Sequence, residues 1–406
     1  MKFEIEQTEF MSKLGKVDKF VKDKKNQLCV LDVTDNGISL TTFNGTTTIR
    51  MKALTDTKSL NILETGTVCL STGMLFQSIK SLPKIWLKDS YAPMTFETWG
   101  TTDKKLRISV PKSHVDLVIV KKDCIPEIPD FKDAIELKIP KKYLFTAINQ
   151  VAYATSLDSS RPVLTGVQLR FQDGTLMADG TDSHQLAHVE LEGAYHPNDI
   201  SKNVILSAKE LKNIATSFTS VNNEFEPLTI KFEAKSNSEI GLVQILNDTA
   251  ELTLRQIVGG YPDMDKLVQL TDDSSTFVTF NYYSLLDTIK HMATMSNLDQ
   301  NRKVKLHIDP EKGVANAESC SDLGKIKEDI IVDEVKGETL DIYISQIFFL
   351  NLLKAYSGYD KITFGFNGAL KPAFVKTVPS ADSDPTDQDI SHDITSVQML
   401  TPIQVQ

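Results

Sequence analysis

The sequence has no long hydrophobic run. Nowhere in its 406 residues do eighteen apolar residues follow one another, although a helix that crosses a membrane needs about that many. The amino terminus, MKFEIEQTEF, also lacks the basic and then apolar order of a secretory signal. We therefore expect a cytoplasmic protein that has no membrane partner.

Cysteine is scarce, and the spacing of the few residues present excludes two kinds of structure. The chain has 4 cysteines, and no two of them form a CxxC pair. Neither a zinc site nor a disulfide framework is indicated, and we expect no metal and no other cofactor. The thiols, which we expect to be reduced and mostly buried, belong to Cys29, Cys69, Cys124 and Cys320.

Positive charge is in deficit over the whole chain, but not everywhere along it. The formal net charge is -10, whereas a protein that grips phosphates usually carries a basic face. Residues 13–25 nevertheless contain six lysines and two aspartates. At helical spacing these lysines separate from an apolar stripe, a pattern that fits an ordinary solvated helix face as well as a basic binding surface. The stripe comprises Phe10, Leu14, Val17 and Val21, and the opposite face carries Lys16, Lys19 and Lys22.

Recognisable catalytic motifs are absent. No nucleophile elbow, Walker loop, HExxH helix or dinucleotide fingerprint occurs. Asp182, Ser183 and His184 are consecutive, so in an extended chain they point to opposite sides, whereas a triad needs groups that converge from separate elements. Asp263 and Asp265 form a lone D-x-D after Tyr-Pro, which is more typical of a turn than of a metal site. We expect no catalytic residue and no enzyme.

What the chain does contain is one pattern that occurs three times. Each copy has an amphipathic helix, an alternating strand that enters a glycine turn, and a serine that opens a second helix. Both landmarks recur at steps of about 136 to 139 residues, so they keep one register. Three copies of one domain are the simplest explanation. The turn glycines are Gly37, Gly174 and Gly313, and the serines are Ser71, Ser207 and Ser345.

The periodicity of each copy predicts its elements. Period-2 strands around the glycine turns predict antiparallel hairpins with one buried face. Each serine suits the N-cap of the helix that follows it. We therefore expect each copy to be an α+β domain, in which two helices pack on antiparallel sheet. The first helices are expected at residues 8–22, 140–154 and 282–295, and the second helices at residues 71–82, 207–218 and 345–357.

Breaks in the pattern set the expected domain boundaries. Prolines 126 and 129 interrupt it after the first copy, and residues 259–273 separate the second copy from the third. Residues 380–393, SADSDPTDQDISHD, carry five aspartates and match no EF-hand spacing, so we expect a flexible acidic insertion before a final strand. The expected domains are residues 1–130, 131–268 and 269–406.

Four short motifs add a resemblance to the threefold repeat. RPVLTG (residues 161–166) is followed by TDSHQLA (181–187), GGYPDMDKL (259–267) and MLTPI (399–403). In this order, on a repeat of this size, they resemble the bacterial DNA polymerase III sliding clamp, the beta subunit, over essentially the whole chain. That family builds each domain from two helices and small sheets, and two three-domain chains join head to tail in a ring.

The resemblance implies a function in DNA replication. A sliding clamp encircles double-stranded DNA and tethers the replicative polymerase, which makes synthesis processive. A ring can be acidic outside and basic in its helix-lined hole, and it holds DNA by topology, so the net charge is no objection. Lys290 and His291 are weaker candidates for facing the DNA. The main candidates are Lys16, Lys19, Lys22, Lys141, Lys142, Lys209 and Lys212.

The family also implies a peptide pocket between the second and third domains. It captures short linear motifs of the replicative DNA polymerase, the clamp loader and other proteins, with aliphatic walls for an apolar anchor and a few orienting polar groups. Residues at a domain seam can equally be core, and this alternative applies above all to Leu186 and Leu267. Carried over from the resemblance, the pocket residues are Leu164, Thr181, His184, Leu186, Pro262, Lys266, Leu267, Phe348, Leu370, Met399, Leu400, Pro402 and Ile403.

The same resemblance implies a homodimer. In the family, the first domain of one chain meets the third domain of the other. The matching positions here are Leu117, near the end of the first domain, and Thr294 with Met295, at the end of the third copy's first helix.

Some positions depart from the family pattern. Where the family usually has glycine and arginine, this chain has Ser183 and Gln185, and its carboxyl tail lacks the usual arginine. We expect a divergent clamp with altered peptide preference. Two other interpretations stay open: a three-domain scaffold that binds peptides without encircling DNA, and a hydrolase that uses His184 with a distant carboxylate.

Overall fold

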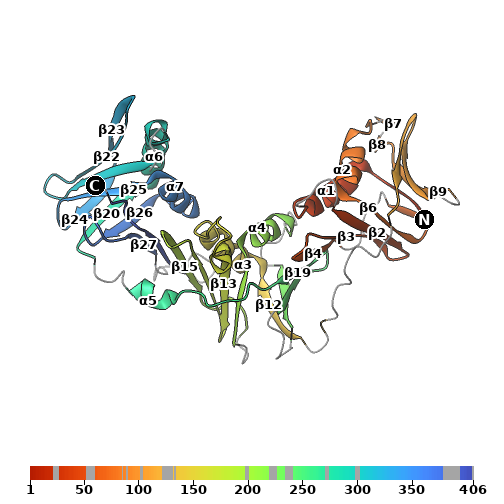
Figure 1. Cartoon of the computed structure of the whole chain (residues 1–406), viewed down its shortest axis with the longest axis horizontal. Helices are drawn as coiled ribbons and strands as arrows, with labels where there is room; N and C mark the ends of the chain where they lie inside the picture. Colours follow the sequence, from red (N-terminus) through yellow and green to blue (C-terminus); the bar gives the residue numbers. More distant parts are fainter. Residues whose placement is uncertain are drawn as a thin grey trace. The chain divides into compact units, whose positions relative to one another are not determined.

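The chain divides into two compact units (Figure 1). The first unit comprises Met1–Ile139 and Asn213–Gln256, and the second comprises Pro140–Lys212 and Ile257–Gln406. The computed structural model describes residues 1–21, 27–51, 60–84, 86–87, 90–100, 104–120, 131, 134–196, 201–218, 226–233, 241–269, 274–297, 302–377 and 394–404.

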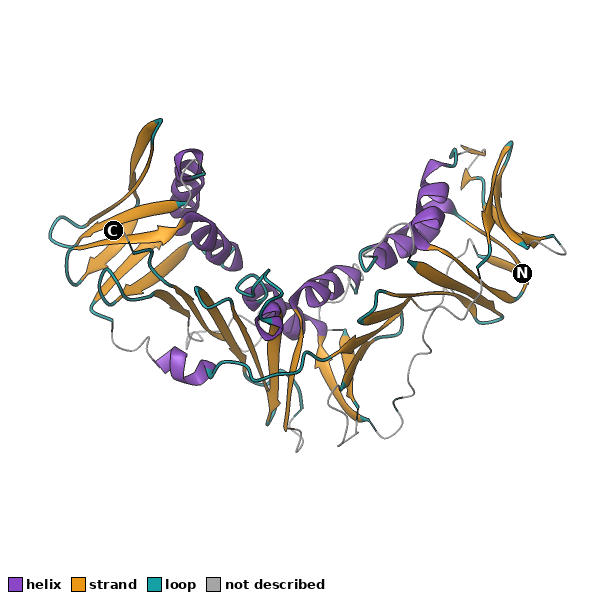
Figure 2. Ribbon diagram, viewed as in Figure 1, coloured by secondary structure: helices purple, strands orange, loops and turns teal. Residues whose placement is uncertain are grey.

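Helices occur close to all six predicted places, and a short additional helix, α5, lies where a turn was expected. The prediction of an α+β fold is confirmed, since these helices accompany antiparallel sheets (Figure 2). The first helix ends earlier than residue 22, at Asp18. The helices are α1 (Gln7–Asp18), α2 (Thr72–Ser81), α3 (Lys141–Val151), α4 (Ala208–Ser217), α5 (Met264–Gln269), α6 (Tyr282–Ser296) and α7 (Gln346–Ala355), with a 3-10 turn, η2, at Pro162–Thr165.

The strands of the first unit form antiparallel sheets on which α1 and α2 pack. Their orders are β11-β10-β9-β1-β5, β12-β17-β18-β19-β4-β3-β2-β6 and the short pair β7-β8. The strands are β1 (Lys2–Ile5), β2 (Leu28–Thr34), β3 (Gly37–Phe43), β4 (Thr47–Met51), β5 (Asn61–Glu64), β6 (Gly66–Ser71), β7 (Trp86–Leu87), β8 (Ser90–Tyr91), β9 (Met94–Trp99), β10 (Lys105–Val110), β11 (Ser113–Val118), β12 (Ile135–Pro140), β17 (Pro227–Phe232), β18 (Leu242–Leu246) and β19 (Ala250–Arg255).

The second unit contains a large sheet of order β16-β13-β14-β15-β28-β27-β26-β20-β24 and a smaller one of order β23-β22-β21-β25. Helices α3 and α7 lie on one side of the large sheet, and α5 lies on the other (Figures 1 and 2). The strands are β13 (Gly166–Gln172), β14 (Thr175–Thr181), β15 (Gln185–Leu191), β16 (Ser201–Ser207), β20 (Thr276–Asn281), β21 (Lys303–Asp309), β22 (Val314–Ser321), β23 (Gly324–Ile330), β24 (Val332–Lys336), β25 (Leu340–Ser345), β26 (Lys361–Phe366), β27 (Ala373–Thr377) and β28 (Ile394–Leu400).

The turn glycines of the three copies lie at hairpin turns, as predicted. Gly37, Gly174 and Gly313 adopt φ values of 125°, 88° and 64°, a region that favours glycine because a side chain would clash there. Each follows one strand of an antiparallel hairpin or begins the next: β2–β3, β13–β14 and β21–β22.

The serine landmarks are confirmed in two copies and wrong in the third. The Ser71 Oγ accepts a hydrogen bond from the Met74 amide, and the Ser207 Oγ accepts one from the Glu210 amide, at 3.4 Å in each case. Ser345 precedes α7, but its side chain accepts no capping hydrogen bond. The first amide of α7, that of Gln346, donates to the Arg302 carbonyl at 2.9 Å, just as the first amide of α2, that of Thr72, donates to the Gln27 carbonyl at 2.9 Å.

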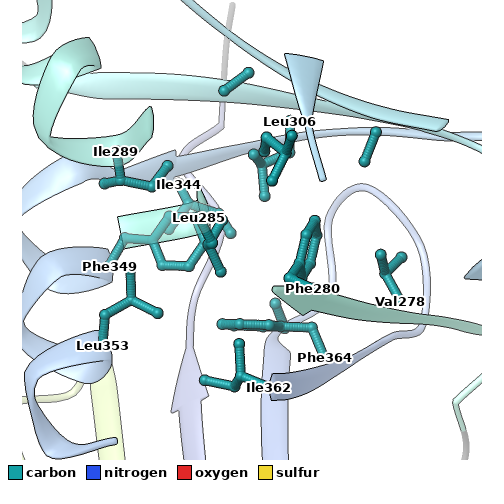
Figure 3. Packing of buried hydrophobic residues seen from close by; sticks show 14 of the residues in the cluster. Val278, Phe280, Leu285, Ile289, Leu306, Ile344, Phe349, Leu353, Ile362 and Phe364 are labelled. Carbon is teal, nitrogen blue, oxygen red and sulfur yellow. The ribbon is translucent and has the colours of Figure 1, made fainter. Parts of the chain in front are cut away.

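The third copy has a core of interleaved aliphatic and aromatic side chains (Figure 3). Leu285 and Ile289 of α6 and Phe349 of α7 are fully buried against Phe280 and Phe364 of the large sheet. Phe364 makes edge contacts with both of those phenylalanines, at centroid distances of 5.9 and 5.4 Å. The buried face of α6 continues to Met292, at the spacing of an amphipathic helix.

Strand pairing continues across both of the expected domain boundaries. In the first unit β19 pairs with β4, and in the second unit β15 pairs with β28 over seven positions. Compact units defined by contact therefore need not coincide with sequence repeats. The division into residues 1–130, 131–268 and 269–406 stays a prediction about the repeats.

Several predictions fall on residues outside the described ranges. They concern Lys22, Cys124, the prolines at 126 and 129, and the acidic insertion at 380–393. Of the remaining cysteines, Cys29 and Cys69 are buried and Cys320 is exposed, and all three are free thiols. Burial raises the pKa of the Cys29 thiol to about 12. Across the described ranges, no helix has both the length and the apolar character to cross a membrane.

Candidate functional site

A small apolar cluster lies on the α5 side of the large sheet. Leu186 of β15 pairs with Met399 of β28, and Met399 pairs with Phe374 of β27, so the three side chains share one face. Met264 of α5 completes the cluster, in which every member is at most 7% exposed. Tyr261 and Leu267 pack against it while partly buried.

This cluster combines predicted and missed residues. Leu186, Leu267 and Met399 were expected at a peptide pocket, whereas neither Met264 nor Phe374 was predicted there. Met264 could have been found only if residues 264–267 had been assigned to a helix, because a spacing of three then places it on the same face as Leu267. Phe374 could not, because the pairing of β27 with β28 is not visible in the sequence.

The segment that carries α5 is fixed to the sheet before the helix begins. Gly259 has φ 146°, and a Cβ there would lie 2.4 Å from a methyl carbon of Val163, so only glycine fits. The Tyr261 hydroxyl donates to the carbonyls of Gly166 and Asp179, at 3.1 and 3.2 Å. Burial raises the pKa of Tyr261, which keeps the hydroxyl a donor.

A polar network lies beside the apolar cluster. Arg170 of β13 donates from Nε to Asp179 Oδ2 at 3.1 Å and makes a bidentate pair with Asp265 of α5 at 2.8 and 2.9 Å. His188 Nδ1 lies 2.7 Å from the other Asp179 oxygen. The hydrogen bond from Arg170 lowers the pKa of Asp265, and the adjacent Arg170 charge lowers it further. The YPDMD segment, where a turn was predicted, leads into helix α5, which begins at Met264.

The loop with Asp182, Ser183 and His184 has a structural role in this fold. Asp182 Oδ1 accepts the amides of His184 and Gln185, both at 2.8 Å, and Oδ2 accepts the Gln185 side-chain amide at 2.9 Å. Thr181 closes the same turn, since its hydroxyl donates to the Gln185 carbonyl at 2.7 Å. The aspartate therefore satisfies backbone donors and does not orient a histidine for catalysis.

His184 is exposed and lies between two other predicted pocket elements. Its ring stacks on Phe348 of α7 with centroids 6.2 Å apart and planes at 14°. Its carbonyl accepts both the amide and the hydroxyl of Thr401, each at 2.9 Å. The Ile403 amide donates to the Tyr343 carbonyl at 2.7 Å. These bonds hold the MLTPI segment against β15 and β25, with Pro402 and Ile403 half-buried.

The other predicted pocket residues differ in exposure. Leu164 of η2 is buried, Pro262 and Lys266 are exposed, and Leu370, in the connection from β26 to β27, is 70% exposed. The prediction that Leu400 lines the pocket disagrees with the structure, because Leu400 is fully buried in the core of the third copy. The physical reason is strand alternation, because Met399 faces the small cluster and the next residue must face the opposite side.

Exposure also separates the predicted DNA-facing lysines. Lys209 and Lys212 on α4 are exposed, as is Lys19 at the end of α1. Lys16 and Lys142 are half-buried. The first three lysines are therefore more accessible to solvent than Lys16 and Lys142.

The prediction that Lys141 faces the DNA disagrees with its burial. Lys141 is 4% exposed, because it stands three residues before Leu144 and seven before Ile148, on the buried stripe of α3. The two weaker candidates have acidic partners: Lys290 pairs with Asp287, and His291 Nδ1 lies 2.7 Å from Glu328.

The predicted dimer positions lie on the edge strand β11 and at the end of α6. Leu117 is 6% exposed, so its side chain packs inside its own protomer, which disagrees with a role in the dimer interface. Its neighbour Val118, on the edge strand β11, is 69% exposed. Thr294 is exposed and Met295 is half-buried. The Met295 sulfur accepts the Ser321 hydroxyl at 3.5 Å, which connects the end of α6 to the turn before edge strand β23.

No cluster of metal-ligating side chains occurs within the described part of the chain: no three or more His, Cys, Asp or Glu groups there could hold a metal ion together. Asp265 is taken up by Arg170, and Asp263 by Lys266 at 2.8 Å. The two carboxylates of the D-x-D motif therefore serve ion pairs.

Comparison with known proteins gives matches along the whole chain. Models of the DNA polymerase III beta subunit match at residues 138–263, for its central domain, and 270–391, for its C-terminal domain. A protein named beta sliding clamp from Streptococcus pneumoniae is 28% identical over 410 residues, which is 99% of this chain and 98% of that protein. One from Bacillus subtilis is 25% identical over 379 residues, or 91% and 89% of the two chains.

Solved structures agree with this similarity. The crystal structure of the DNA polymerase III beta chain from Streptococcus pneumoniae superposes with a TM-score of 0.81 at 26% identity, covering 100% of both chains. The DNA polymerase sliding clamp from Bacillus subtilis gives a TM-score of 0.82 at 25% identity, again over 100% of both.

Proposed function

Since the chain belongs to the family of the bacterial DNA polymerase III beta subunit, the sliding clamps, we propose that two copies join head to tail into a ring around double-stranded DNA. The ring tethers a replicative DNA polymerase for processive synthesis and has no catalytic activity of its own. The observation that carries this proposal is the match over 99% of the chain to a protein named beta sliding clamp.

The distribution of charge supports the passage of DNA through the ring, although the protein as a whole is acidic. The net charge is -10, yet exposed lysines occur on helices of both units, at Lys19, Lys209 and Lys212. These side chains, together with the half-buried Lys16 and Lys142, are the proposed DNA-facing set. A ring that retains DNA by topology needs only weak, exchangeable phosphate contacts, which lets it slide.

The surface around the small apolar cluster is the proposed docking site for short linear motifs of the polymerase, the clamp loader and other partners. Leu267 and Leu370 offer apolar surface, and His184 with Phe348 offers an aromatic face. Gln185 turns its amide back onto Asp182, so this position gives no positive charge to an acidic motif. We expect a peptide preference that differs from that of clamps with arginine there.

Encirclement can be tested by changing DNA topology. The protein is loaded by a clamp loader onto a nicked circular plasmid, freed of excess protein by gel filtration, and the circle is then cut once. We expect the protein to leave the linear DNA within minutes while it stays on the uncut circle. As a control, linear DNA whose ends are blocked by bulky protein should retain it.

Other outcomes would favour the alternative functions. Retention on open linear DNA equal to that on the circle rejects encirclement. Peptide binding without any retention on the circle favours a scaffold that does not encircle DNA. Hydrolytic turnover that is abolished by His184→Ala would favour an enzyme.

A further inference from the structure

Arg170 connects the interior of the large sheet to the short helix α5. Its guanidinium donates to Asp179 from Nε and to both Asp265 oxygens from its two terminal nitrogens. Asp179 is on β14, in the sheet, whereas Asp265 is on α5, outside the sheet. The Arg170 side chain therefore joins β14 and α5, which are about ninety residues apart in the sequence.

The sheet side of this network is largely buried. The Asp179 side chain is 0% exposed, and the side chains of His188 and Arg170 are 7% and 20% exposed. A buried carboxylate without partners is costly, so Asp179 holds Arg170 in one orientation. The planar guanidinium then presents its remaining edge to Asp265 in a geometry that suits a bidentate pair. Arg170 is thus held from the sheet side by a contact that does not involve Asp265.

Helix α5 needs such an anchor. It has only 6 residues, and a helix this short has little stability of its own in water. Its apolar contacts come from Met264, which is buried, and Leu267, which is half-buried. Asp265 lies about 100° around the helix from Met264, so its pair with Arg170 anchors a second face and fixes the rotation of the helix about its axis.

We propose that Arg170 is a positioning residue for the docking site, and that it acts by fastening Asp265 so that α5 presents Leu267 in the orientation that a peptide needs. This inference rests on the proposed peptide-docking function. It assigns to the pair an effect on affinity, although Arg170 itself lies beneath α5 and is not expected to touch the peptide.

The test compares two aspartates of the same segment. Asp265→Asn removes the charge that faces Arg170, whereas Asp263→Asn removes a charge of similar exposure that faces Lys266 and retains a good capping side chain. The probe is a fluorescein-labelled peptide with the clamp-binding motif of a bacterial replicative polymerase, titrated by fluorescence anisotropy. We expect Asp265→Asn to weaken binding roughly three- to tenfold and Asp263→Asn to stay within about twofold.

Two further measurements separate positioning from general stability. Melting temperatures should be equal within about 2 °C, because Asp265 is largely exposed, while amides at 264–269 should exchange hydrogen faster in Asp265→Asn only. In an Arg170→Lys background, which keeps the charge on Asp179 neutralised, Asp265→Asn should add little further loss of affinity.

Equal affinity of Asp265→Asn and the unchanged protein would overturn the proposal, as would equal losses in the two aspartate variants. If the unchanged protein binds no such peptide, the proposed docking function fails. The positioning role is then decided by hydrogen exchange alone, and unaltered exchange at 264–269 in Asp265→Asn overturns it.

Discussion

Leu267 is the residue at which core and surface meet in the docking site. Its side chain packs against the small apolar cluster but remains half-exposed. Replacement by aspartate places a charge where the apolar anchor of the peptide should bind. Binding then has to remove water from this charge, which costs free energy. We expect Leu267→Asp to weaken binding of the polymerase peptide at least tenfold, measured by fluorescence anisotropy.

Gln269→Asp provides the control for this change, because Gln269 is exposed on the same short helix. It adds the same charge two residues away and should leave affinity within about twofold. Similar losses in both variants would mean that added charge, and not the apolar contact, weakens binding, and would contradict the role of Leu267.

Single residues also mark the limit of what sequence could predict. Lys141, Leu117 and Leu400 all have the residue types expected at their sites, yet all three are buried. A one-residue difference in strand phase separates Leu117 from Val118 and Leu400 from Met399, and a motif match does not resolve that phase. The Arg170–Asp265 pair was out of reach for a different reason, since nothing in the sequence shows which residue on a strand faces a distant helix.

At the scale of the element, the beginnings of helices differ in how they are capped. The Asn281 side chain accepts the Ser284 amide at 3.0 Å at the start of α6, whereas Ser345 makes no such bond at the start of α7. We therefore expect Asn281→Ala to cost about 1 kcal/mol of unfolding free energy, or about 2–4 °C in melting temperature. Calorimetry or thermal circular dichroism would measure it.

Ser345→Ala is the matched comparison, since it changes the equivalent position of the second helix in the same copy. It should change the melting temperature by less than about 1 °C, because no capping hydrogen bond is lost. A larger effect for Ser345→Ala than for Asn281→Ala would show that the observed caps do not govern helix stability here.

Element type was predictable wherever the period was long and regular. The helix predicted at residues 282–295 is α6, which begins at Tyr282 as predicted and ends one residue later, at Ser296. Helix α5 was missed because six residues hold barely more than one turn, too few to show a period. Its conformation depends on tertiary contacts such as the one with Arg170, so the local sequence alone favoured a turn.

At the scale of the whole molecule, we propose that the edge strand β11, which carries Leu117 and Val118, closes the ring in the first unit. Val118 on this strand is 69% exposed, and Leu63, on the opposite edge strand β5 of the same sheet, is 51% exposed. A charge at a subunit interface is buried without a partner. We expect Val118→Asp to weaken dimerisation at least tenfold, measured by analytical ultracentrifugation over a concentration series.

Leu63→Asp makes the same chemical change on the other edge and should leave the dimer constant within about twofold. A dimer that survives Val118→Asp, or one that Leu63→Asp disrupts equally, would move the proposed joint away from β11. Because both side chains are exposed in the protomer, neither variant should impair folding.

The repeat and its motifs sufficed to predict the family and an α+β architecture of helices on antiparallel sheet. They could not predict how the copies join. Leu186 pairs with Met399 although more than two hundred residues separate them, and no local pattern encodes a contact at that distance. Pairing between repeats also explains why the docking cluster draws on β15, β27 and β28 together.

The position of β28 has a consequence for synthesis on the ribosome. This strand follows every other described strand in the chain, yet it lies in the middle of the large sheet, between β15 and β27. Until residue 400 has left the exit tunnel, both neighbours present open edges that can pair with other chains. A nascent chain stalled before β28 should therefore be prone to aggregation, and completion of the sheet and of the docking cluster should be among the last steps of folding.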